Sequence, residues 1–120
     1  MPNSEVVLLA SAARTATQTS GDLNNPNCTG IRVILDVTTA GTGSITVTIN
    51  GRDPASGKYH LLLAGAAVTT EVTNAYLIFP GATAAANAAA NNALPETFQI
   101  VVTANNANTI TYSVGYQLLI

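Results

Sequence analysis

Residues 31–38 read IRVILDVT, and in this stretch large apolar side chains occupy every second position. Successive side chains of an extended chain point to opposite sides, so the apolar set shares one face. That set is Ile31, Val33, Leu35 and Val37. The same alternation recurs in residues 44–50, 97–103 and 109–116. Threonine, frequent on the other face, keeps a strand preference while it stays hydrated, so these runs are predicted to be half-buried strands.

Turn sequences separate the predicted strands. Residues 53–58 read DPASGK, in which the proline suits the second position of a type I turn and the glycine suits a left-handed backbone. We therefore expect a turn there that leads into a strand at residues 59–63. Residues 104–108 read ANNAN and are predicted to form a hairpin loop between the last two strands, because asparagine tolerates left-handed backbone angles.

The alternating runs predict an all-β fold, a small antiparallel β-sandwich or barrel-like domain of about seven to nine strands with an extended N-terminal arm. We expect the β domain to cover residues 28–120, with the Ala/Asn-rich residues 82–93 as a flexible loop that has room for a short helix. Residues 1–27 combine one apolar stretch with a polar segment. They are predicted to be an N-terminal arm and lead-in strand that lie on a partner.

Charge is scarce in this chain. Only 8% of its 120 residues are charged, whereas 48% are hydrophobic. An ordinary soluble domain carries roughly a quarter charged residues, and charge discourages strand edges from pairing with other molecules. We therefore expect a homo-oligomer, with a trimer favoured, in which much of the surface lies against protein.

The candidate interface residues are apolar residues near the two ends of the chain. They are Val6, Val7, Leu8, Leu9, Leu118, Leu119 and Ile120. Exposed apolar patches and unpaired strand edges invite association. For the C-terminal group, burial in a subunit interface and burial in the domain's own core are equally compatible with the pattern.

No arrangement of residues predicts catalysis or a cofactor. His60 and Cys28 are the only histidine and the only cysteine, too few for a zinc site. Asp36 falls on the polar face of a predicted strand and Asp53 in a turn, so a pair of catalytic carboxylates is disfavoured. We predict no enzyme activity, no catalytic residue, no metal site and no cofactor.

Composition also argues against several partners. The three arginines are scattered, which disfavours direct nucleic-acid binding. No stretch approaches the ~20 apolar residues of a membrane-spanning helix. The apolar run at residues 6–10 is shorter than the roughly 7–15 residues of a secretion signal, so we expect synthesis in the cytoplasm.

The turn and strand motifs together resemble a family of small virion structural proteins of tailed bacteriophages. The resemblance covers about residues 6–118 and is carried by four segments: residues 30–38, residues 44–49 followed by GRDPASGKY at residues 51–59, Phe79-Pro80-Gly81, and Thr111-Tyr112-Ser113-Val114-Gly115. Members of this family are most often head decoration proteins or other head- and tail-associated proteins, so the resemblance implies many identical copies bound to a symmetric shell or tube. From it we expect a head decoration protein, located in the virion and bound to the major capsid protein or another virion protein. No functional residue transfers from the family.

Two alternatives stay open. The first is a tail-tube, neck or tail-tip component of the same kind of particle. The second is a carbohydrate- or receptor-binding β module that uses aromatic side chains and exposed loops. Its candidate residues are Tyr59, Tyr76, Tyr112 and Tyr116.

Overall fold

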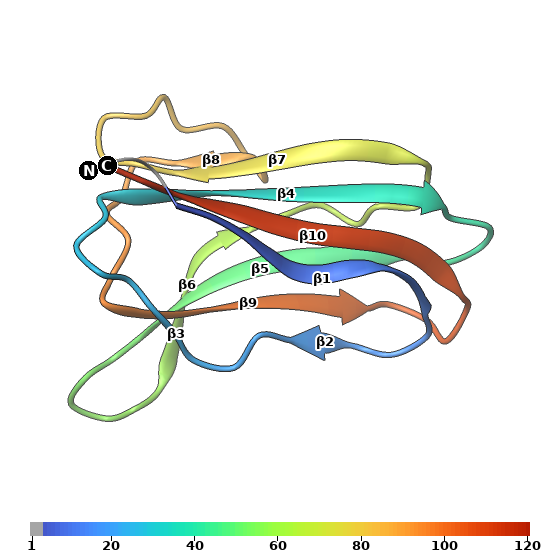
Figure 1. Cartoon of the computed structure of the whole chain (residues 1–120), viewed down its shortest axis with the longest axis horizontal. Coiled ribbons are helices and arrows are strands. Elements are labelled where there is room, and N and C mark those ends of the chain that lie inside the picture. Colours follow the sequence, from blue (N-terminus) through green and yellow to red (C-terminus); the bar gives the residue numbers. More distant parts are fainter. Residues whose placement is uncertain (1–3) are drawn as a thin grey trace.

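The computed structural model describes residues 4–120, which form an all-β sandwich of two sheets, as the sequence predicts (Figure 1). Sheet A contains, in spatial order, β1 (Ser4–Arg14), β10 (Ile110–Leu119), β4 (Gly30–Thr39), β7 (Val72–Ile78) and the short β8 (Ala89–Ala90). Sheet B contains β2 (Gln18–Thr19), β9 (Thr97–Ala104), β5 (Ile45–Arg52) and β6 (Tyr59–Ala64), and β3 (Leu23–Asn24) also pairs with β9.

The antiparallel pairs are nested one inside the other. The hairpin β5–β6 is innermost, followed outward by β4–β7, then by β9 with β2 and β3, and finally by β1–β10. The nested pairs together form one long two-stranded antiparallel ribbon. Two further pairings, β10–β4 and β9–β5, fold this ribbon into two facing sheets. This winding is the jelly-roll arrangement, one of the ways in which antiparallel proteins limit exposed strand edges.

The alternating apolar residues form the core between the sheets, which confirms the strand predictions. Sheet A contributes the inward face of β4, and sheet B contributes the inward faces of β5 and β9. Phe98 of β9 meets Tyr116 of β10 edge-to-face, with ring centroids 6.2 Å apart and ring planes at 89°. This aromatic pair therefore joins the two layers directly.

The predicted turn at residues 53–58 is confirmed. The backbone N–H of Asp53 donates to the carbonyl of Lys58 at 2.7 Å, and Gly57 has a φ of +73°. The Asp53 carboxylate accepts from the Ser56 hydroxyl at 2.7 Å and from the Ala55 N–H at 3.1 Å. These two hydrogen bonds hold the pKa of Asp53 below its ordinary value, and the one from Ser56 has the larger effect.

The expected hairpin at residues 104–108 is wrong. The loop joins β9 of sheet B to β10 of sheet A and so crosses between the layers. Within the loop the Asn106 side-chain oxygen accepts from the Asn108 N–H at 3.1 Å. The asparagine amides donate outside the loop, to the β4–β5 connection and to the start of β5. The Asn105 amide donates to the Ser44 and Thr46 hydroxyls at 3.0 and 2.9 Å. The Asn106 amide donates to the Thr42 carbonyl at 3.0 Å.

The structure also differs from the predicted N-terminal arm. β1 pairs with β10 from Ser4 to Arg14, so this segment belongs to the domain's own sheet, and β2 and β3 belong to the other. The boundary at residue 27 therefore separates no arm from the sandwich, and residues 1–3 of the expected arm lie outside the described residues. The register shifts between Val7 and Leu9 and again before Ala12, which breaks the period of two in this strand.

Arg14 fastens β1 to β10 beside the second register shift. One guanidinium nitrogen donates to the Tyr112 carbonyl at 2.6 Å and to the Ala12 carbonyl at 3.3 Å. The other donates to the Ala10 carbonyl at 2.5 Å. The guanidinium carbon also lies 4.8 Å from the centre of the Tyr112 ring. These contacts satisfy carbonyl groups where the ladder is irregular.

The Ala/Asn-rich residues 82–93 form no helix. They contain β8, which runs parallel to β7, and a tight turn at Asn87, whose φ is +61°. The Asn91 side chain accepts from the Gly81 N–H at 2.8 Å and ties the two ends of the segment together.

Tyr112 gives a testable pH dependence. Its hydroxyl is buried and has no hydrogen-bond partner within residues 4–120. Burial raises the pKa of Tyr112, and the Arg14 charge offsets this in part; burial likewise raises the pKa of Tyr76 and Tyr116. An unfolded tyrosine titrates near pH ~10. The folded protein thus holds these protons more tightly, so stability should be intact below pH ~10 and fall above it.

The matching variant is Tyr112→Phe. At pH 7 we expect a free energy of unfolding equal to or greater than that of the unaltered protein, because the variant removes an unpaired buried hydroxyl. Between pH 10 and 12 we expect a shallower loss of stability. Urea titrations at several pH values measure both effects. A loss of more than about 2 kcal/mol at neutral pH would mean that the hydroxyl has a favourable partner.

Candidate functional site

The outer face of sheet A carries an apolar row that crosses four strands. Val7 of β1 pairs with Gly115 of β10, Gly115 with Ile34 of β4, and Ile34 with Ala75 of β7. The neighbours of Ile34 and Gly115 along their strands are buried, so these four residues point away from the core. We call Val7, Gly115, Ile34 and Ala75 the apolar row.

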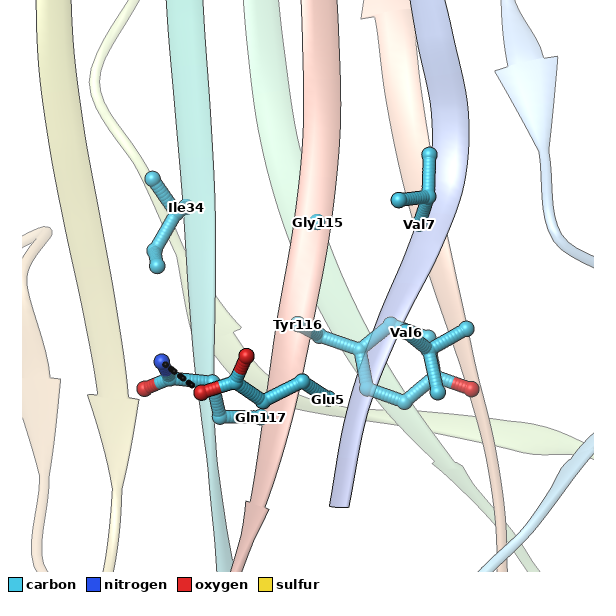
Figure 2. Close-up of a pocket in the computed structure, with 7 residues that line it drawn as sticks. All are labelled: Glu5, Val6, Val7, Ile34, Gly115, Tyr116 and Gln117. Carbon is cyan, nitrogen blue, oxygen red and sulfur yellow. Dashed lines mark hydrogen bonds between the residues drawn. The ribbon is translucent and has the colours of Figure 1, made fainter.

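A shallow groove opens at Gly115, between the Val7 and Ile34 side chains (Figure 2). Its volume is about 330 Å³, and its lining is completed by Glu5, Val6, Tyr116 and Gln117. A Cβ added to Gly115 would meet the Val6 carbonyl oxygen at 3.4 Å, an ordinary contact. Packing therefore does not demand this glycine, and its effect is to leave the groove open.

Polar rows border the apolar row on both sides. On one side Arg32 of β4, Gln117 of β10 and Glu5 of β1 lie in register. Arg32 donates to the side-chain amide oxygen Oε1 of Gln117 at 3.1 Å, and the side-chain amide nitrogen of Gln117 donates to the Glu5 carboxylate at 3.3 Å. On the other side the Thr73 hydroxyl donates to Asp36 at 2.9 Å. The groove therefore has an acidic group at its β1 end and a basic group at its β4 end.

Besides the groove, sheet A has an open edge at β1. This strand ends the strand order of sheet A, and within residues 4–120 no strand pairs with its far side. It is 11 residues long, and its charged residues are Glu5 near the start and Arg14 at the end. A long edge strand presents its backbone N–H and C=O groups to another chain, although the Ala10 and Ala12 carbonyls already accept from Arg14.

The predicted interface residues fall into two groups. Val6 and Val7 are 38% and 76% exposed, and Leu8 and Leu9 are half-buried against the core.

At the C-terminal end the structure distinguishes the two alternatives. Leu118 and Leu119 are 4% and 9% exposed, so they are buried within the domain, whereas Ile120 is 52% exposed. The sequence interpretation did not select Gly115 and Ile34. The available signal was an apolar side chain, Ile34, on the outer face of a predicted strand.

A polar cluster lies at one end of sheet B. Arg52 forms an ion pair with Asp22 at 3.1 Å, and the Tyr59 hydroxyl donates to the other Asp22 oxygen. This hydrogen bond to a carboxylate is the main reason why the pKa of Tyr59 is raised. Beside the cluster, a depression of about 400 Å³ is lined by Arg52, Pro54, Pro95, Glu96 and Thr97.

Asp36 and Asp53, the two carboxylates weighed as a catalytic pair, are not brought together. Asp36 bonds Thr73 on the outer face of sheet A, and Asp53 closes the turn between β5 and β6 of sheet B. Within the described range of 4–120, no three His, Cys, Asp or Glu residues are grouped so that they could hold a metal ion.

The single histidine and cysteine have structural surroundings. His60 is exposed, and a Cβ on Gly51 would come within 2.9 Å of its ring, so the ring lies close over that glycine. Cys28 is buried in a turn that Asn25 organises. The Asn25 amide donates to the carbonyls of Cys28 and Leu94 at 2.8 and 3.1 Å. Residues 4–120 contain no helix long and apolar enough to cross a membrane.

Comparisons with known proteins complete the description. No family model matches the chain, and no curated protein matches it. Among solved structures, it is similar to a chain in "Structure of infectious bursal disease virus Gx strain", with 15% sequence identity and a TM-score of 0.46. The match covers 97% of this chain and 32% of that chain, so this protein spans about a third of the length of the chain it resembles.

Proposed function

We propose that this protein is a structural component of a virion, a decoration protein that binds the assembled head in many copies. The observation that carries the proposal is the open edge of β1. This strand is 11 residues long and has no charged residue between Glu5 and Arg14. The scarce charge of the whole chain, 8%, supports the same function. So does the jelly-roll winding, as a fold-level analogy, because it recurs in viral capsid domains and in lectins.

The edge explains how such a protein holds a shell together. A segment of a neighbouring virion protein, such as the major capsid protein, adds a strand beside β1 through backbone hydrogen bonds that set the register. The exposed Val6 side chain then loses contact with water, worth about 25 cal/mol for each Å² of apolar surface. In this proposal the decoration protein binds the assembled capsid shell and not the separated capsid subunits. Its binding at many sites therefore stabilises the shell.

The test uses heads assembled without the protein. Added protein should bind in many copies, should raise the resistance of the heads to heat or chelators, and should do so with little dependence on salt, because few charges are screened. Ser11→Lys places a charge on the β1 edge and should reduce binding about ten-fold or more. Leu61→Lys, on the exposed edge strand β6 of sheet B, is the matched control and should bind normally.

Other outcomes select the alternatives. Particles that lack the protein and have normal heads without tails would replace this proposal with a tail-tube, neck or tail-tip component. Complete particles that fail to attach to cells would favour a carbohydrate- or receptor-binding module. The observation that favours this second candidate is the exposed Tyr59 ring beside the Asp22–Arg52 pair, because an aromatic face next to hydrogen-bonding groups suits a sugar. In that case Tyr59→Ala should abolish attachment.

A further inference from the structure

The geometry points to a second copy of this chain as the occupant of the outer face of sheet A. In the pairing that we infer, two copies pack face to face about a twofold axis that runs parallel to the strands, over β10. This interface is separate from the open edge of β1, so it goes beyond the proposed contact with a virion protein.

The first argument is charge complementarity. Glu5, Gln117 and Arg32 stand in one row on β1, β10 and β4. A half-turn about an axis along β10 keeps every row at its own height and exchanges β1 with β4. Glu5 of one copy therefore faces Arg32 of the other, and the symmetry repeats this contact, so that two opposite-charge contacts form.

The same operation matches the apolar row with itself. Val7, Gly115 and Ile34 lie side by side on three strands of one copy (Figure 2). After the half-turn, Val7 of each copy faces Ile34 of the other, and Gly115 faces Gly115. Facing sheets pack about 10 Å apart, a separation that valine and isoleucine side chains fill from opposite sides. The absence of a side chain at position 115 lets these four side chains close over the two grooves. The exposed Val7 side chain, 76% accessible in a single copy, is buried in the pair.

The remaining charge on this part of the face does not oppose the pairing. Asp36 lies in register with Ser113 and accepts a hydrogen bond from Thr73. In the proposed pair it faces the irregular segment of β1 near residues 10–11, which has no acidic residue and beside which the Arg14 guanidinium donates to the Ala10 carbonyl at 2.5 Å. A twofold axis across the strands would instead pair Arg32 with Asp36 and would give Glu5 no role. The two geometries therefore differ in what Glu5 does.

The pairing is isologous and yields dimers, or assemblies with an even number of copies built from dimers. It differs from the trimer expected from the scarce charge and the apolar C-terminal residues. Sedimentation of the full chain from about 1 to 100 µM should show a reversible monomer–dimer equilibrium, in the range typical of small interfaces. A species that stays monomeric throughout, or one that is trimeric, overturns the inference.

Charge reversal tests the register. Glu5→Arg and Arg32→Glu should each weaken self-association about ten-fold or more, because each turns two attractive contacts into two repulsive ones. An equimolar mixture of the two variants should form heterodimers with close to the original affinity, since every arginine then faces a glutamate. Thermal unfolding of the variants verifies that both are folded. A mixture that fails to associate, or a Glu5→Arg variant that dimerises normally, contradicts the proposed register.

Two further measurements complete the test. Gly115→Leu fills the groove and should abolish dimerisation while the monomer stays folded; a Gly115→Leu variant that dimerises normally overturns the inference. Arg32→Glu, which leaves the β1 edge unaltered, should still bind heads if both proposals are right. If the protein forms dimers that do not bind heads, the proposed function is contradicted and the dimer interface is supported. If a strictly monomeric protein binds heads, the dimer interface is contradicted and the proposed function is supported.

Discussion

Gly30→Ala is expected to lower the free energy of unfolding by about 3 kcal/mol or more, the upper part of the range for overpacking. A Cβ at this position would lie 2.2 Å from the Ile78 carbonyl oxygen and 2.7 Å from a ring carbon of Phe79. The first of these is a backbone atom in the strand paired with β4. Relief of the clash must therefore separate β4 from β7 at the start of their ladder.

Urea denaturation followed by circular dichroism measures this loss. Gly115→Ala is the matched control, because it also adds one methyl group to a glycine of sheet A but creates only a contact of 3.4 Å. We expect this control to stay within about 1 kcal/mol of the unaltered protein. If the two variants are equally stable, the close approach of Gly30 to Ile78 is not a constraint on the fold.

Phe98→Ala is expected to destabilise the protein by about 3–5 kcal/mol, the usual cost of removing a buried aromatic ring. Phe98 is fully buried on β9, and its ring meets Tyr116 edge-to-face at 6.2 Å across the two layers. The substitution removes transfer free energy, leaves a cavity, and deletes the aromatic contact, which itself contributes about 0.5–1.5 kcal/mol.

Phe98→Leu separates these contributions. It keeps most of the buried apolar volume, so we expect it to cost less than half as much as Phe98→Ala. The same urea titration gives both values. A loss below about 1 kcal/mol for Phe98→Ala would show that the space between the sheets collapses freely around the missing ring.

The strands and the turn that the sequence predicted correctly depend on local rules. The run at residues 31–38 is readable because one side of β4 is buried and the other is not, so that burial follows the period of two. The turn at residues 53–58 is readable because proline, glycine and aspartate each meet a backbone requirement within six residues.

The features that were missed depend on contacts distant in sequence. β1 escaped recognition as a strand of the domain because its two register shifts interrupt the alternation around Leu9. The Asn-rich residues 104–108 suit a tight turn and a crossing between sheets equally well. The pairing of β9 with β5 and of β10 with β4 places the two flanking strands in different sheets. The groove needs Val7, Gly115 and Ile34 in one row, which only the pairing of β1, β10 and β4 creates.

The nested winding has a consequence for the order in which this protein can assemble itself during synthesis. The β5–β6 hairpin closes a short loop and can form as soon as both strands have left the ribosome. β10 is made after the other nine strands of this domain, yet it lies between β1 and β4. Sheet A is therefore incomplete until β10 has been made, and the pairing of Ser4 with Leu118 must close a loop that contains nearly all of the described residues. Such distant contacts slow folding, and through that interval β1 is exposed on both edges to other nascent chains.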